Sequence, residues 1–126
     1  MPGIPVRVIT KKGEEAFTIG EWKDAVIANG AALSGEVNLG MPYDTLLIAI
    51  PAITASQVSI QVAEATEGTF QPLHITEGDG TSAPVLSDAG TGVFTWNIPL
   101  GGFQFIKVAT SVNQGAARTF RVCGRN

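Results

Sequence analysis

The clearest pattern along the chain is an alternation of apolar and polar positions in short segments. In the segment 57–64, Val58, Ile60 and Val62 occupy every second position, and the residues between them are polar. A period of two is the spacing of a β-strand that buries one face. This segment therefore predicts a strand whose apolar side points to the core.

Several other segments carry a related signal. Segments 94–98 and 119–123 alternate in the same way, whereas 45–50 and 103–108 are apolar on both sides near their centres. The second kind is typical of a strand that is buried on both faces or covered by an interface. Weaker strand candidates are 6–10, 15–19, 32–39, 70–75 and 84–87. Fifteen glycines and seven prolines separate these segments, at intervals of roughly ten residues. The sequence predicts an all-β fold, an antiparallel β-sandwich of the jelly-roll type.

The start of the chain differs from the rest. Residues 1–22 have mixed charges, a Pro-Gly-Ile-Pro opening and a turn-like Lys11-Lys12-Gly13. They predict an N-terminal arm or β-hairpin that extends from a β-sandwich domain over 23–126. A short helix is expected only over 20–28, where Trp22, Ala25 and Val26 share one helical face.

Composition favours association over a free monomer. The chain has 126 residues, of which 44% are hydrophobic and 15% charged, whereas an average soluble domain has about 25% charged residues. Apolar surface that charge does not cover is commonly buried between subunits. We therefore expect a homo-oligomer.

The charges are unevenly distributed. The segment 24–106 contains eight carboxylates and no Lys or Arg. All eight basic residues of the chain lie before or after this segment. Complementary patches of this kind steer partners and fix their register. The basic residues expected to face an adjoining copy or another subunit are Lys107, Arg118, Arg121 and Arg125. With a net charge of −3, nucleic-acid binding is not expected.

Signatures of catalysis and metal binding are weak or missing in the sequence. His74 is the only histidine, and no G-x-S-x-G or phosphate-loop motif occurs. The best metal candidate is the acidic loop 77–80 with Asp88 beyond it, but it lacks the spacing of a calcium loop. Cys123 is the only cysteine, which excludes an internal disulfide. We expect no enzyme activity, no cofactor and no metal.

Aromatic residues offer a second kind of candidate site. Trp96 shares its parity with Phe94 and Ile98 and is expected in the core, which leaves Trp22 and Tyr43 as the expected exposed aromatics. Such residues serve as anchors in protein interfaces. They also form stacking platforms for sugars, and both possibilities stay open here.

The longest uninterrupted apolar run, 46–50, has five residues, which is far too short to cross a bilayer. No basic-then-apolar leader opens the sequence. We expect no membrane partner and synthesis in the cytoplasm.

One resemblance extends from Ser34 to Val122. It rests on the following segments: Ser34-Gly35-Glu36-Val37-Asn38-Leu39-Gly40, Leu47-Ile48-Ala49-Ile50-Pro51-Ala52, Val58-Ser59-Ile60-Gln61-Val62-Ala63, Thr69-Phe70-Gln71-Pro72-Leu73, and Phe105-Ile106-Lys107-Val108-Ala109-Thr110-Ser111 continuing through Val112-Asn113-Gln114-Gly115-Ala116-Ala117-Arg118-Thr119-Phe120. Read together, they resemble the small β-sandwich virion proteins of tailed bacteriophages. These are capsid decoration, or cement, proteins and accessory head or tail proteins.

The resemblance implies a virion structural protein that binds other subunits and performs no reaction. The expected partners are the phage major capsid protein and further copies of the chain, with a homotrimer as the first candidate. The expected location is the capsid surface, after assembly in the host cytoplasm. An alternative is a tail, neck or fibre component, or a carbohydrate-binding module that contacts host glycans. The expected interface residues are Ile4, Val6, Val8 and Phe17 of the arm, the two aromatics Trp22 and Tyr43, and the basic residues Lys107, Arg118, Arg121 and Arg125.

Overall fold

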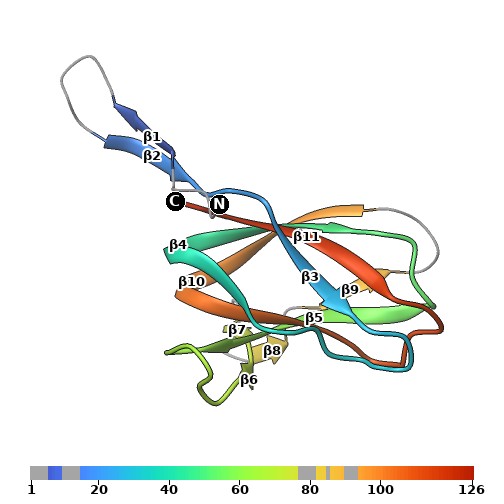
Figure 1. Ribbon diagram of the computed structural model, residues 1–126. Coiled ribbons are helices and arrows are strands. Elements are labelled where there is room, and N and C mark those ends of the chain that lie inside the picture. Colours follow the sequence, from blue (N-terminus) through green and yellow to red (C-terminus); the bar gives the residue numbers. More distant parts are fainter. Residues whose placement is uncertain (1–5, 10–14, 77–81, 85, 90–93) are drawn as a thin grey trace.

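The computed structural model describes residues 6–9, 15–76, 82–84, 86–89 and 94–126, and within these ranges all regular structure is β (Figure 1). The predicted all-β class is confirmed. The helix expected over 20–28 is wrong, because Lys23–Ile27 forms strand β3. Ala25 and Ile27 are buried there while Asp24 and Val26 are exposed, which is the period of a strand and not of a helix.

Eleven strands occur in the described residues. Their bounds are β1 Val6–Ile9, β2 Glu15–Ile19, β3 Lys23–Ile27, β4 Val37–Ile50, β5 Ser56–Ala63, β6 Gln71–Pro72, β7 His74–Thr76, β8 Ser82–Pro84, β9 Leu86–Ala89, β10 Phe94–Thr110 and β11 Arg118–Arg125. Nine of them form one antiparallel sheet in the order β1-β2-β11-β4-β10-β5-β6, with β3 added on β11 and β9 added on β5. Strands β7 and β8 form a separate pair.

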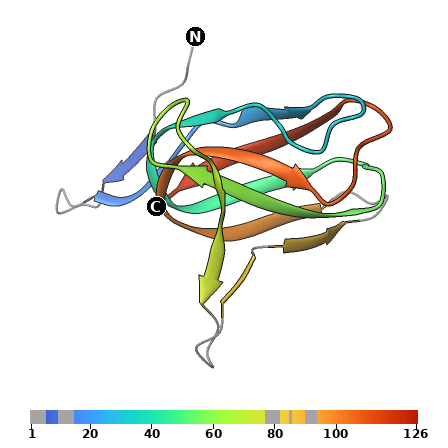
Figure 2. The same cartoon turned by 90° about the horizontal axis from the view of Figure 1, so that it is seen from below.

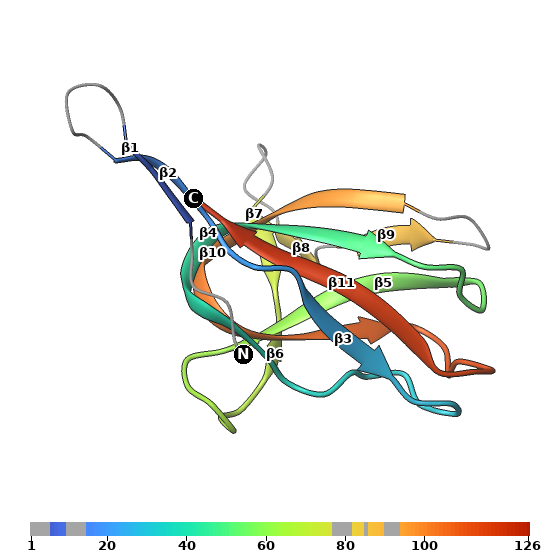
Figure 3. The ribbon, with the colours of Figure 1, turned by 45° about the horizontal axis from the view of Figure 1, so that its top comes forward.

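Two long strands, β4 and β10, run through the whole sheet and bend. The first part of β10, from Phe94, pairs with the end of β4, whereas its last part, up to Thr110, pairs with β5. The register of the β4–β10 pair shifts between Pro99 and Phe105. Gly40 of β4 and Gly101 of β10 have φ values of 98° and 71°, which glycine adopts without a Cβ clash. Both strands curve at this point (Figures 2 and 3).

The bend folds the sheet over one apolar core. One half consists of β3, β11, the end of β4 and the start of β10, and the other of β5 and the remaining parts of β4 and β10. Both halves contribute to the same cluster of buried side chains, which includes Ile27, Leu46, Ile48, Ile50, Val58, Ile60, Leu100, Ile106, Val108, Phe120 and Val122. The nine strands of this sheet are thus continuous across the bend, and the segments 94–98 and 103–108 belong to one strand instead of two.

Strands β1 and β2 form a ribbon that projects from the rest of the described strands (Figures 1 and 3). Their register places Val6 opposite Ile19 and Val8 opposite Phe17. The pairing of Ile19 with Arg125 joins the ribbon to β11. The turn expected at residues 11–13 lies outside the described residues, and the division of the chain at residue 22 stays a prediction.

Candidate functional site

A shallow hollow of about 340 Å³ lies on the outer face of the half-sheet that contains β11. It is lined by Trp22, Ala49, Thr95 and Arg121, which come from four different segments of the chain. The strand register accounts for their meeting, because Arg121 and Thr95 both lie opposite Ala49 on the two neighbouring strands. Ala49 and Thr95 contribute the small side chains of the lining, and Trp22 and Arg121 contribute the large ones.

Charge in this hollow is balanced. Arg121 lies directly opposite Asp24 across the β3–β11 pair, and its Nε donates to the Asp24 carboxylate at 3.0 Å. Both side chains are more than half exposed, so the pair contributes little to stability. Trp22 stands beside it with 41% of its surface exposed, which confirms the expectation that this aromatic residue is accessible.

Next to the hollow, Cys123 is fully buried although it faces away from the core side of β11. The adjacent segment covers it, and the Cys123 thiol donates to the Gly20 carbonyl at 3.1 Å. Burial raises the pKa of the Cys123 thiol above its ordinary value. A thiol that stays protonated and covered is a packing group and not a nucleophile.

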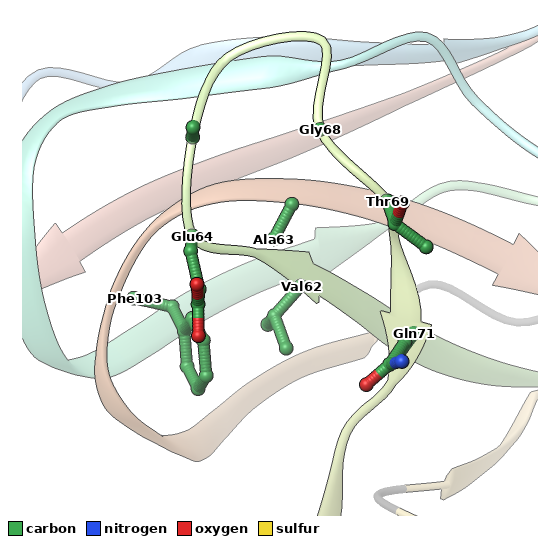
Figure 4. A pocket seen from close by; sticks show the side chains of 8 residues that line it. Val62, Ala63, Glu64, Gly68, Thr69, Gln71 and Phe103 are labelled. Carbon is green, nitrogen blue, oxygen red and sulfur yellow. The ribbon is translucent and has the colours of Figure 1, made fainter.

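A second pocket, of about 400 Å³, lies at the turn between β5 and β6 (Figure 4). Its apolar part consists of Val62, Ala63 and Phe103, and its polar part includes Glu64 and Gln71 at the two ends of the bounding loop. Phe103 reaches this place because β10 bends just before it. No pattern in the sequence predicts this pocket, since its residues come together only through the bend.

The loop beside this pocket is held by a carboxylate. The two Glu36 oxygens accept hydrogen bonds from the Thr66 hydroxyl at 2.8 Å and the Glu67 amide at 2.7 Å. Glu67 has φ of 56°, a left-handed conformation that this amide contact supports. On the same half-sheet, Lys107 Nζ lies 4.6 Å from the centre of the Phe70 ring.

Three loops, around residues 31, 54 and 112, meet at Gln114. The loops that join β3 to β4, β4 to β5 and β10 to β11 lie at the end of the molecule opposite the β1–β2 ribbon (Figure 1). This side chain is 1% exposed. Its Oε1 accepts from the Thr54 amide at 2.9 Å and from Arg118 Nε at 3.3 Å, and its Nε2 donates to the Val112 carbonyl at 3.2 Å. Its backbone amide donates to the Ala31 carbonyl. Gln114 therefore clamps the loops around residues 31, 54 and 112.

The expected exposure of Tyr43 is wrong. Its side chain is fully buried and packs against the backbone at Gly20 and Gly124. A Cβ on Gly124 would lie 2.0 Å from Tyr43 Cδ2, so only glycine fits beside this ring. The residue was expected outside only because it remained after Trp96 had been assigned to the core, whereas it lies within β4, between the predicted strand segments 32–39 and 45–50.

The four basic residues expected at an interface do not form one patch. Lys107 lies over Phe70, Arg118 belongs to the loop clamp and Arg121 pairs with Asp24. Arg125 is exposed at the end of β11, where it pairs with β2 of the ribbon. Three of the four thus have partners within the chain, and only Arg121 lines the hollow.

The apolar residues of the arm are placed by register alone. Val8 and Phe17 lie directly opposite each other, so they share one face of the ribbon, while Arg7 and Thr18 share the other. Val6 lies on the same face as Val8. Ile4 is outside the described residues.

The candidate residues for metal binding and catalysis are not brought together within the described ranges. In the described ranges no group of three or more His, Cys, Asp or Glu side chains is arranged to hold a metal ion. The acidic loop 77–80 is outside these ranges. His74 is exposed at the start of β7. The part of the chain that the structure describes holds no helix long and apolar enough to cross a membrane.

No protein-family model matches the sequence, and no curated protein matches it significantly. Solved structures with a similar fold include the SPBc2 prophage-derived protein YomS, with 13% identity over 84% of this chain and 94% of that one and a TM-score of 0.52. At this identity the likeness shows a shared fold. A cyanophage Pam1 capsid chain (14% identity, 87% and 83% covered, TM-score 0.41) and a chain from Bacillus endospore appendages (12%, 94% and 94%, 0.42) are more distant.

Proposed function

We propose that this chain is a structural protein of a bacteriophage virion, a decoration protein that binds the outer shell as a homo-oligomer and braces neighbouring capsid subunits. A protein that binds only the assembled shell stabilises it by mass action. Cyclic symmetry, with a trimer as the first candidate, uses one modest contact several times. In this proposal the chain performs no reaction.

The observation that carries the proposal is the projecting β1–β2 ribbon. A two-stranded ribbon is marginally stable in water unless something else packs on it. Here, the register gathers Val6, Val8, Phe17 and Ile19 on one face, and the pairing of Ile19 with Arg125 joins the ribbon to the sheet. Such a ribbon is suited to pack on, or add strands to, a neighbouring subunit.

Two further observations support the proposal. Among the residues that the structure describes, Val26, Leu33 and Val112 are large hydrophobic residues that are exposed and do not line the hollow. Exposed apolar side chains in a chain with so few charges favour burial between subunits. The fold shared with the prophage-derived protein YomS is in keeping with a phage origin.

The direct test of the proposal is the copy number of the protein in purified virions, measured by quantitative mass spectrometry against the major capsid protein. A simple ratio to the shell subunit is the expected result. A copy number matching a neck or tail ring would replace the capsid placement by a tail or fibre role. Absence from virions would overturn the proposal.

A matched pair of substitutions tests the ribbon. Val8→Asp places a charge on its apolar face, and Thr18→Asp places the same charge on the opposite face. We expect Val8→Asp to abolish binding to capsids that lack the protein, in a co-sedimentation assay, while Thr18→Asp binds like the unmodified chain. Equal binding by both variants would remove the ribbon from the interface.

A further inference from the structure

The hollow beside Trp22 has the shape and chemistry of a small saccharide site. We propose that it binds one neutral pyranose ring of a glycan or polysaccharide. This inference goes beyond the proposed virion role and does not depend on it, because the hollow belongs to the outer sheet face and not to the ribbon.

The shape of the hollow fits a single ring. Its volume of about 340 Å³ is near the lower end of the range of small-molecule sites, about 300–1,000 Å³. The small side chains of Ala49 and Thr95, on the adjacent strands β4 and β10, leave room for a ligand, and Trp22 and Arg121 are the large side chains of the lining. The hollow lies on an outer sheet face, so the glycosidic continuation of a longer chain can extend into solvent.

Trp22 supplies the apolar contact. Its side chain is 41% exposed, so part of it is available to a ligand. The face of an indole ring carries partial negative charge. One face of a pyranose presents C–H groups of partial positive charge, so a sugar ring gains both apolar contact and electrostatic attraction by stacking on Trp22. An acyclic polyol with the same hydroxyl groups lacks such a flat face.

The polar groups match hydroxyls better than an anion. A sugar hydroxyl both donates and accepts, and the hollow offers the Arg121 guanidinium as donor and the Thr95 hydroxyl as either. The Asp24 carboxylate, 3.0 Å from Arg121 Nε, is an acceptor next to this donor. Because this carboxylate also neutralises the guanidinium, a phosphate or sulfate group would gain little charge attraction. The ligand class is therefore a neutral sugar.

The test is a titration of the ¹⁵N-labelled full chain, followed by NMR. The probes are the methyl glycosides of glucose, galactose, mannose and N-acetylglucosamine, each up to about 50 mM. At the binding free energy per non-hydrogen atom that is usual for drug-sized ligands, a ring of about 13 such atoms binds with a Kd of about 1 mM. D-Mannitol is the acyclic control. We expect at least one glycoside to give saturable shifts at the amides of Trp22, Ala49, Thr95 and Arg121, and mannitol to give none.

Three substitutions make the test specific. Trp22→Ala should weaken binding at least tenfold. Arg121→Ala should weaken it while the fold is kept, since an exposed ion pair contributes little to stability. Val26→Ala, which removes an exposed apolar side chain of the neighbouring strand β3 that does not line the hollow, should leave binding unchanged.

Three results would overturn the proposal: no saturable shift with any of the four glycosides, equal shifts with mannitol, or binding that survives Trp22→Ala. If the protein self-associates through this face and the NMR signals of Trp22 are lost, the hollow is a protein interface and not a sugar site. The copy number in virions is a separate measurement, so either proposal can fail while the other stands.

Discussion

The loop clamp at Gln114 gives the sharpest stability prediction. Replacing Gln114 by Ala removes the hydrogen bonds to the Thr54 amide at 2.9 Å and the Val112 carbonyl at 3.2 Å, together with the contact to Arg118. Each such bond contributes about 1 kcal/mol net, and a buried donor left without a partner costs about 1–3 kcal/mol. Because Gln114 is 1% exposed, we expect Gln114→Ala to lower the free energy of unfolding by about 2–4 kcal/mol.

For a domain of this size, 1 kcal/mol corresponds to a change in Tm of about 4 °C, so the melting temperature should fall by about 8–16 °C. Urea denaturation followed by circular dichroism measures the free energy, and calorimetry measures Tm. Gln114→Met is the matched variant, because it keeps most of the side-chain volume and removes the hydrogen bonds. We expect it to lose most of the same stability.

Two outcomes separate the causes. A Met variant as stable as the unmodified chain, beside a destabilised Ala variant, would assign the effect to packing instead of hydrogen bonding. A loss of less than about 0.5 kcal/mol in Gln114→Ala, the range of ordinary surface substitutions, would refute the clamp altogether.

Three further predictions concern the opposite end of the molecule. Gly124→Ala should destabilise the protein by about 3 kcal/mol or more, because the new Cβ would overlap the Tyr43 ring, and a normal urea midpoint would contradict this packing. Stability should fall as pH rises above about 9–10: burial raises the pKa of both Cys123 and Tyr43 above ordinary values of 9.0 and 10.0, so the unfolded chain loses these protons first. Tyr43→Phe removes one of these two groups, so its free energy of unfolding should fall less between about pH 9 and 11. Urea denaturation at each pH measures this, and a pH profile equal to that of the unmodified chain would contradict the prediction. Cys123 should resist thiol reagents in the native protein and react within minutes in urea, and rapid native labelling would show that its cover opens.

Local patterns in the sequence predicted the shorter strands β2 and β5 well, because a strand that buries one face leaves its period in the residues. The segment 57–64 and strand β5 agree to within one residue at each end. Trp22 was also predicted correctly as exposed. These features depend on neighbouring residues along the chain.

The long strands were missed because glycine and proline were taken as the ends of strands. Gly40 and Pro42 lie inside β4, and Gly101 and Gly102 lie inside β10. At these positions the chain turns a corner of the sheet and then continues in the same strand, with a shift of register. The residues that line each pocket come from segments far apart in the sequence, so no local sequence pattern could predict the pockets.

The bent strands have a consequence for how the protein folds. Since β4 and β10 each belong to both halves of the sheet, neither half has a complete set of strands without the other. Strand β11, at the end of the chain, pairs with both β3 and β4, so the central pairings join residues far apart in the sequence. Folds dominated by such contacts form slowly, in milliseconds to seconds. The two halves are therefore expected to fold and unfold as one cooperative unit, with no stable intermediate made of one half.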